Sequence, residues 1–201
     1  MSVHTEVGEG AHHSSTGLDN RKLAMWAFLG SECMFFGSLI MVALINRSNT
    51  MGMDPEHYGQ GALNLVLTSF TTFVLLTSSL AMVLALAAFR NGRLGWGRLW
   101  LGVVIVLGAI FLGGQVVEFN DFVLEGLTPS TNNYWASFYT LVGFHGTHVG
   151  IGIAWLLATF IYSFRGRFRT SSTTWGIEMA GLYWHFVDLV WVGIFTLIYL
   201  I

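Results

Sequence analysis

The chain has 201 residues, of which 54% are hydrophobic and only 10% are charged, with a formal net charge of −2 at neutral pH. Soluble domains carry about a quarter charged residues, so this composition excludes an ordinary soluble fold and indicates an integral membrane protein. The near-neutral charge argues against a nucleic-acid-binding surface. The single cysteine, Cys33, excludes an internal disulfide or a thiolate metal cluster.

Residues 1–21 form a polar segment that contains acidic residues together with His4, His12 and His13. This segment lacks the apolar core of a signal peptide, and its acidic residues are atypical of a mitochondrial transit peptide. The histidines have no nearby partners at metal-ligand spacing. We therefore predict a flexible, solvated tail that precedes a membrane domain at residues 22–201.

Five hydrophobic segments follow the tail, and each is long enough to cross a bilayer as a helix. Both prolines of the chain, Pro55 and Pro129, fall between these segments, so the helices are expected to be unbroken. The sequence thus predicts an all-α membrane protein with a bundle of five transmembrane helices, without the paired broken helices of many transporters. The predicted helices lie at about 23–45, 63–89, 96–122, 134–164 and 175–201.

Basic residues are distributed unevenly among the connections. Eight of the nine Lys and Arg residues lie at the end of the tail or near the second and fourth connections, whereas the first connection contains only Arg47. Cytoplasmic connections of membrane proteins carry an excess of Lys and Arg. We therefore predict a cytoplasmic N-terminus and a C-terminus on the outside.

The last segment contains three polar residues, Glu178, His185 and Asp188. On a helix, Glu178 and His185 lie two turns apart on nearly the same face, and Asp188 lies one turn beyond His185. A charged side chain at bilayer depth costs at least about 2.5–3.5 kcal/mol, so these residues should face protein or water. The last helix is therefore expected to present a polar stripe to a neighbour.

Acidic residues are also present in two other segments. Glu32 lies about nine residues inside the first segment, or roughly 13 Å deep at 1.5 Å per residue. Glu178 enters from the same side, so the two carboxyl groups could share a proton in the inner half of the bilayer. Glu118, in the third segment, is expected near the outer surface.

Two histidines in the fourth segment, His145 and His148, are one turn apart and lie near the middle of the bilayer with His185 and Asp188. These residues could form structural hydrogen bonds between helices or a network that buffers or conducts protons, and their number favours the network. Two histidines one turn apart cannot bind a haem iron from opposite sides. A haem between His185 and one histidine of the fourth segment stays open on spacing alone.

Four motifs occur in the order found in one protein family. They are S-E-x-M-F-F at 31–36, Q-x-x-E-F at 115–119, G-F-H-G-x-H-V at 143–149 and Y-W-H-F-V-D-x-V-W at 183–191. On these motifs the chain resembles subunit III of the haem–copper terminal oxidases, the cytochrome c oxidase subunit 3 family. It is similar to the shorter, five-helix bacterial form, which lacks the first two helices of the seven-helix form.

The resemblance implies a subunit of the bacterial plasma membrane that carries no redox centre itself. The haems and copper are expected in the adjacent catalytic subunit I, with subunit II in the same complex, and family members also bind phospholipid. The implied role is to stabilise the catalytic subunit during turnover and to support proton uptake from the cytoplasmic side. Glu32, Glu178 and the run at 183–188 are more similar to the aa3-type cytochrome c oxidases than to the quinol oxidases, which remain the alternative. A b-type cytochrome and a proton-coupled transporter are the competing classes.

Overall fold

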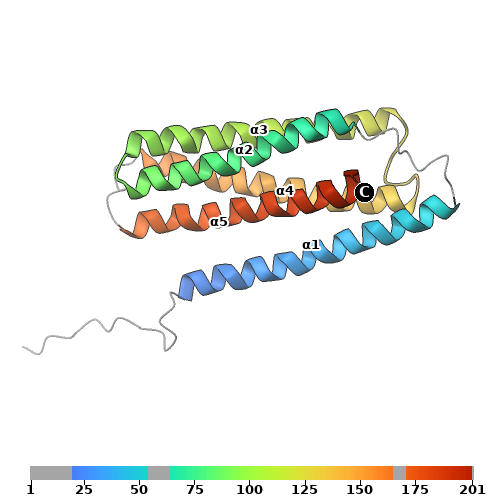
Figure 1. Cartoon of the computed structure of the whole chain (residues 1–201), viewed down its shortest axis with the longest axis horizontal. Helices are drawn as coiled ribbons and strands as arrows, with labels where there is room; N and C mark the ends of the chain where they lie inside the picture. The colour runs from blue at the N-terminus through green and yellow to red at the C-terminus, as the bar shows by residue number, and fades with distance from the viewer. Residues whose placement is uncertain (1–19, 54–63, 165–170, 201) are drawn as a thin grey trace, which may run out of the picture.

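The computed structural model describes residues 20–53, 64–164 and 171–200, and the predicted tail before residue 20 lies outside these ranges. The described residues form helices and no β-strand, and five of the helices are long and apolar enough to cross a membrane. This confirms the predicted all-α, five-helix architecture. The helices are α1 Asn20–Met53, α2 Leu65–Arg90, α3 Leu94–Leu124, α4 Asn133–Ser163 and α5 Ser171–Ile194, followed directly by the π-helix η1 Phe195–Leu200 (Figure 1).

The helices run roughly parallel to one long axis, and α1 begins at the end of the bundle opposite to the end of η1 (Figure 1). The helices α2 and α3 lie side by side, α4 packs against α1, α3 and α5, and α5 also packs against α1 and α2. We use the term basic end for the end that carries Lys22, Arg90, Arg93 and Arg98. The chain enters α1 and turns from α2 into α3 at this end.

Short polar residues define several helix boundaries. Asn64 precedes α2 and accepts a hydrogen bond from the backbone N–H of Leu67, and Asn132 precedes α4 and accepts one from Trp135. Such side chains satisfy backbone donors that a helix N-terminus leaves unpaired. Between α2 and α3, Gly92 has a φ of 71°, in the left-handed region that glycine adopts without a steric penalty. These local signals explain why the predicted boundaries of α2 to α4 lie close to the observed ones.

The centre of the bundle is organised around Trp184 of α5, which is fully buried. A Cβ atom added to Gly108 of α3 would lie 2.7 Å from the indole, and one added to Gly152 of α4 would lie 3.0 Å from it. The indole Nε1 donates a hydrogen bond to Ser78 Oγ of α2 at 3.0 Å. One side chain therefore joins four helices, and two of its contacts require the absence of a side chain.

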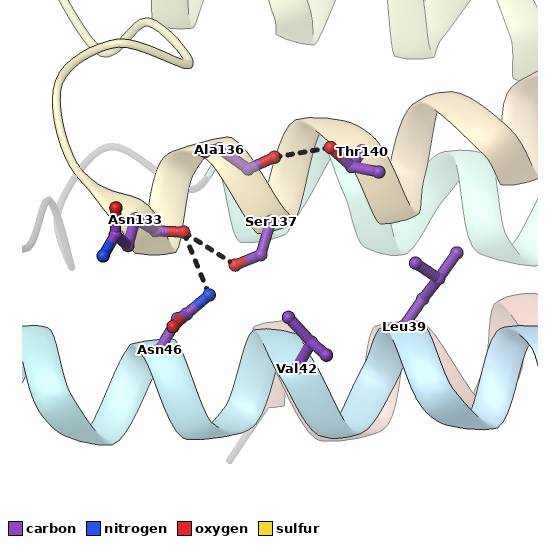
Figure 2. Close-up of a pocket in the computed structure, with 7 residues that line it drawn as sticks. All are labelled: Leu39, Val42, Asn46, Asn133, Ala136, Ser137 and Thr140. Carbon is purple, nitrogen blue, oxygen red and sulfur yellow. Dashed lines mark hydrogen bonds between the residues drawn. The ribbon is translucent and has the colours of Figure 1, made fainter.

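The first helix continues to Met53, beyond the predicted end at Ile45. The residues that follow Ile45 are polar, and at least two of them make tertiary contacts. Asn46 Nδ2 donates to the carbonyl of Asn133 at 3.3 Å, across a pocket of about 270 Å³ between α1 and α4 (Figure 2). Arg47 Nη1 donates to the carbonyl of Leu197 at 3.2 Å. The polar sequence predicted a loop after Ile45. The helix continues instead, and its polar side chains Asn46 and Arg47 are hydrogen-bonded to neighbouring elements.

The end of the last segment is also different from the predicted α-helix, because residues 195–200 form a π-helix. In a π-helix the backbone hydrogen bonds span one residue more than in an α-helix, so the turn is wider and the side chains point in different directions. Tyr199 is buried here and donates to Glu118 Oε2 at 3.3 Å. The carbonyl groups of Leu197 and Ile198 lie within hydrogen-bond distance of Arg47 Nη1.

Gly108→Ala is expected to lower the unfolding temperature of the purified protein in detergent, because the added methyl group would overlap the Trp184 ring. Overpacking of this kind costs about 1–3 kcal/mol. Gly113→Ala is the matched control, since it lies on the same helix and an added Cβ there meets nothing within 4 Å. Equal unfolding temperatures for the two variants would contradict the close packing of α3 on Trp184.

Candidate functional site

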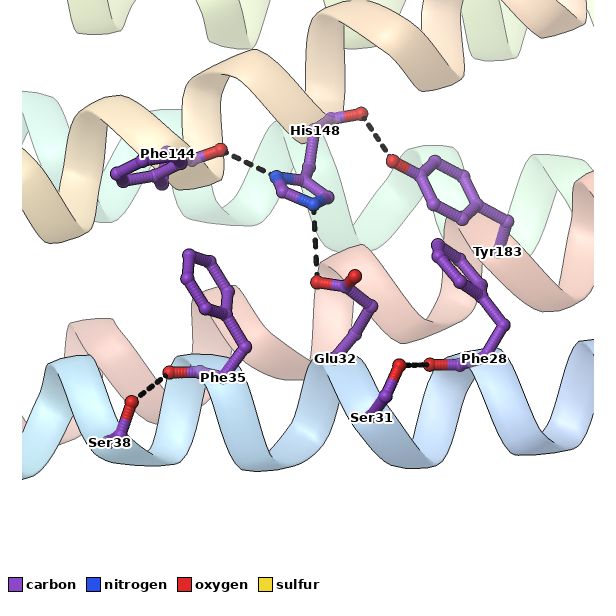
Figure 3. Close-up of polar contacts among 8 residues, drawn as sticks. All are labelled: Phe28, Ser31, Glu32, Phe35, Ser38, Phe144, His148 and Tyr183. Carbon is purple, nitrogen blue, oxygen red and sulfur yellow. Dashed lines mark hydrogen bonds and ion pairs between the residues drawn. The ribbon is translucent and has the colours of Figure 1, made fainter.

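Glu32 of α1 and His148 of α4 form a pair between the two helices (Figure 3). Glu32 Oε2 lies 3.4 Å from His148 Nε2, and the two side chains are 19% and 16% exposed. The other ring nitrogen, Nδ1, lies 2.8 Å from the carbonyl oxygen of Phe144. A carbonyl oxygen can only accept, so Nδ1 carries a hydrogen atom.

With Nδ1 protonated, the contact between Nε2 and Oε2 is attractive when one further proton lies between the two side chains. That proton belongs either to the imidazole, which gives an ion pair, or to the carboxyl group, which gives two neutral partners. The net charge of Glu32 and His148 is zero in both arrangements. The site can therefore hold one proton, and transfer of this proton between the two atoms leaves the net charge unchanged.

Aromatic side chains of α1 and α5 lie beside this pair. The ring of Phe36 lies 5.0 Å from the His148 ring, and Phe28 stacks on Tyr183 at 6.4 Å. The Tyr183 hydroxyl donates to the backbone carbonyl of His148 at 3.1 Å, so α5 also contributes to the site (Figure 3). Apolar groups of this kind lower the local dielectric and strengthen the interaction between the two polar side chains.

Glu178 has different partners from Glu32. Its Oε1 accepts from Arg90 Nη2 at 2.8 Å and from Nε at 3.2 Å, and its Oε2 lies 3.7 Å from Lys22 Nζ. Because α5 begins at Ser171, Glu178 lies near the basic end, where cations of α1 and α2 can reach it. Their similar predicted depth suggested that Glu32 and Glu178 share a proton, but the structure places the two carboxyl groups in separate sites. Glu178 links three helices at the basic end and is no partner of Glu32.

The three membrane histidines contact three different helices. His145 is fully buried, its Nε2 lies 3.3 Å from the carbonyl of Val187 on α5, and its ring packs on Trp191 at 4.9 Å. His185 Nδ1 lies 2.6 Å from Ser79 Oγ on α2, whereas His148 faces α1. These contacts favour separate hydrogen bonds over a haem held between two imidazoles. Among the described residues, no three His, Cys, Asp or Glu side chains are grouped to hold a metal ion.

The two other acidic residues predicted for the site are Asp188 and Glu118. Asp188 is 4% exposed, and neither of its carboxyl oxygens has a hydrogen-bond partner in the part of the chain that the structure describes, although Ser79 is close by. Glu118 is also buried, but Thr68 Oγ1 donates to it at 2.7 Å and Tyr199 donates from η1. Glu118 therefore ties three elements together, whereas Asp188 is the one predicted site residue without such a partner among the described residues.

Sequence reasoning identified the acids and histidines but not the neutral residues that position them. Tyr183 could have been recognised from the sequence, because it begins the motif at 183–191 and directly precedes Trp184. Nothing in the sequence pointed to Ser79, since a serine in an apolar helix more often hydrogen-bonds to its own backbone. The partner of each polar side chain was found only through the packing of the helices.

These contacts define a multi-pass helical membrane protein in which carboxyl and imidazole side chains are buried between helices. A family model described as cytochrome c oxidase subunit III matches residues 2–201. The chain therefore belongs to the cytochrome c oxidase subunit III family and is a component of a haem–copper oxidase, as the motifs predicted.

Some relatives of this chain are named as subunits of cytochrome c oxidases and others as subunits of quinol oxidases. Cytochrome c oxidase subunit 3 of Bacillus subtilis (strain 168) is 40% identical over 182 residues, which cover 90% of this chain and 86% of the relative. Quinol oxidase subunit 3 of the same strain is 38% identical over 190 residues, covering 94% and 90%. Cytochrome bo(3) ubiquinol oxidase subunit 3 of Pseudomonas aeruginosa is 33% identical over 195 residues, covering 97% and 91%. The family is thus shown, and the electron donor is not distinguished by these similarities.

Glu32→Ala should destabilise the protein by about 1–3 kcal/mol, because it leaves the half-buried His148 without its partner. Glu32→Gln should cost less, since an amide can still hydrogen-bond to Nε2. Thermal unfolding in detergent measures both. Ser31→Ala is the control, because Ser31 is exposed and bonds to the Phe28 carbonyl of its own helix. If all three variants unfold at one temperature, the pair does not hold α1 against α4.

Proposed function

We propose that this chain is the accessory subunit III of a bacterial aa3-type cytochrome c oxidase and that it carries no redox centre itself. In this proposal the catalytic subunit I, which holds the haems and copper, and subunit II are its partners in the plasma membrane. Membership of the subunit III family supports the existence of such partners. The observation that carries the functional part is the Glu32–His148 pair, which can hold a proton inside the membrane domain.

The proposed mechanism concerns proton supply to the catalytic subunit. The excess of Lys and Arg at the basic end supports a cytoplasmic N-terminus and an outer C-terminus. Glu32 lies ten residues after Lys22, roughly 15 Å from that surface at 1.5 Å per residue. We propose that the pair retains a proton there, releases it toward the catalytic subunit during turnover and is reloaded from the cytoplasm. The same contact also holds α1 in place and so stabilises the complex.

We propose cytochrome c as the electron donor because Glu32, Glu178 and the run at 183–188 are more similar to that branch. A quinol is the alternative, since relatives of both kinds match most of the chain. Oxidation of reduced cytochrome c by the purified complex, compared with oxidation of a quinol, distinguishes the two.

Purification through a tag on this chain should recover a complex that shows haem absorbance. The separated polypeptide should show no haem, because its membrane histidines face Glu32, Ser79 and the Val187 carbonyl. A bis-histidine haem spectrum of the isolated chain that disappears in His185→Ala would contradict the accessory role. The visible spectrum of the complex and of the separated chain measures both outcomes.

An oxidase that contains Glu32→Gln should keep its haem spectrum but take up protons more slowly or inactivate faster during turnover. The amide preserves a hydrogen bond to His148 but cannot carry the proton. The defect should grow as the pH rises, because protons then become scarce. Proton uptake and turnover lifetime should be measured across pH, with Glu118→Gln as the control at the opposite end of the bundle. An unchanged lifetime and proton-to-electron ratio would leave Glu32 with a structural role only.

A further inference from the structure

A polar patch interrupts the apolar surface along the seam between α2 and α5. At its centre, His185 Nδ1 lies 2.6 Å from Ser79 Oγ. Both side chains are partly exposed, and the exposed residues one turn away from them are apolar. These residues are Leu76, Val83 and Leu189, which are between 46% and 68% exposed. The α2–α5 face therefore has a polar centre and an apolar rim.

The hydrogen atoms of this patch follow from its relation to Asp188. Asp188 lies one turn beyond His185 and close to Ser79, and its carboxyl oxygens are enclosed by the chain. An unbalanced charge near the middle of a bilayer is costly, so the Asp188 carboxyl group and the His185 ring should together have zero net charge. Either both groups are neutral, or a carboxylate faces an imidazolium.

Both arrangements place a hydrogen atom on Nε2 of His185. In the neutral arrangement the Asp188 O–H needs an acceptor, and the Ser79 oxygen can supply it. The single hydroxyl hydrogen of Ser79 then goes to Nδ1, which leaves the ring hydrogen on Nε2. An imidazolium carries hydrogen atoms on both nitrogens. His185 Nε2 is therefore a hydrogen-bond donor, and it has no acceptor among the described residues.

This donor can be reached from outside the chain and lies deep in the membrane. Nε2 is not enclosed, in contrast to both oxygens of Asp188. The middle of the span Trp175–Leu200 falls between residues 187 and 188, so His185 lies roughly 4 Å from it along the helix. The hydrocarbon core extends about 15 Å on either side of its centre, so the ester and phosphate oxygens of lipids lie farther out. Acyl chains offer no acceptor, whereas a protein helix can offer a carbonyl or a side-chain oxygen at this depth.

We propose that the α2–α5 face packs against a transmembrane helix of another oxidase subunit, which accepts a hydrogen bond from His185 Nε2. The exposed apolar rim then packs on the same helix and excludes lipid from this bond. Membership of an oxidase subunit family indicates the class of partner. The inference rests on the proposed function in one respect, namely that the chain works inside a multi-subunit oxidase. It does not depend on the electron donor.

Two amide variants separate the outward bond of His185 from its internal contact. The amide nitrogen of Gln lies near the position of Nε2, and that of Asn lies near the position of Nδ1. His185→Gln should keep the bond to the partner, so haem-bearing subunits should copurify with the tagged chain as they do with the unchanged protein. His185→Asn should keep only the contact with Ser79 and should reduce copurification about threefold, the effect of a typical hydrogen bond between membrane helices.

A role of His185 inside this chain alone predicts the reverse order, because only Asn can still reach Ser79. Equal copurification of the two variants, or less with Gln than with Asn, would overturn the proposal. Thr77→Val is the matched control, because Thr77 is exposed on α2 and donates to the Phe73 carbonyl of its own helix. This variant should leave copurification unchanged.

Photocrosslinking identifies the partner directly and leaves His185 in place. A photoreactive p-benzoylphenylalanine at position 189, in place of the exposed Leu189, should form a covalent adduct with another oxidase subunit, detected by mass spectrometry. An adduct with a phospholipid only, or with a second copy of this chain, would overturn the proposal. If the unmodified tagged chain copurifies with no haem-bearing subunit, the proposed function itself is wrong. That outcome is distinct from an assembled oxidase in which the two His185 variants behave alike.

Discussion

The packing of Trp184 is the constraint on which the arrangement of α2 to α5 depends. Helices in a membrane gain little from hydrophobic burial against each other, so close packing and hydrogen bonds must hold them. The indole supplies both, because it fits against Gly108 and Gly152 and donates to Ser78. Its chain neighbours then point to different helices. Tyr183 reaches a carbonyl of α4, and His185 reaches α2.

The sequence predicted the five helices well because apolar length and the Asn caps are local signals. It could not predict which polar side chains meet, since partners such as Glu32 and His148 are 116 positions apart and come together only when α1 packs on α4. Depth suggested Glu178 as the partner of Glu32, but Glu178 lies within reach of Arg90. The extension of α1 and the π-helix at the chain end escaped prediction for the same reason, because both depend on tertiary hydrogen bonds such as those of Arg47.

The helix α4 presents different residues to its neighbours. One face presents His148 to α1, and another places Gly146 and Gly150 beside α3. The helix α1 is the least buried of the five spans, so polar contacts contribute a large share of what holds it. A movement of α1 would therefore change the surroundings of the Glu32–His148 pair.

The central claim is that Glu32 and His148 share one proton that is exchanged during turnover. Infrared difference spectroscopy of the oxidase, between resting and turning-over states, tests it through the C=O stretch of a protonated carboxyl group. A carboxyl band is expected that changes with turnover, disappears in Glu32→Gln and persists in Glu178→Gln, because Glu178 is paired with Arg90 and Lys22. A spectrum that is the same with and without the Glu32 carboxyl group would contradict it.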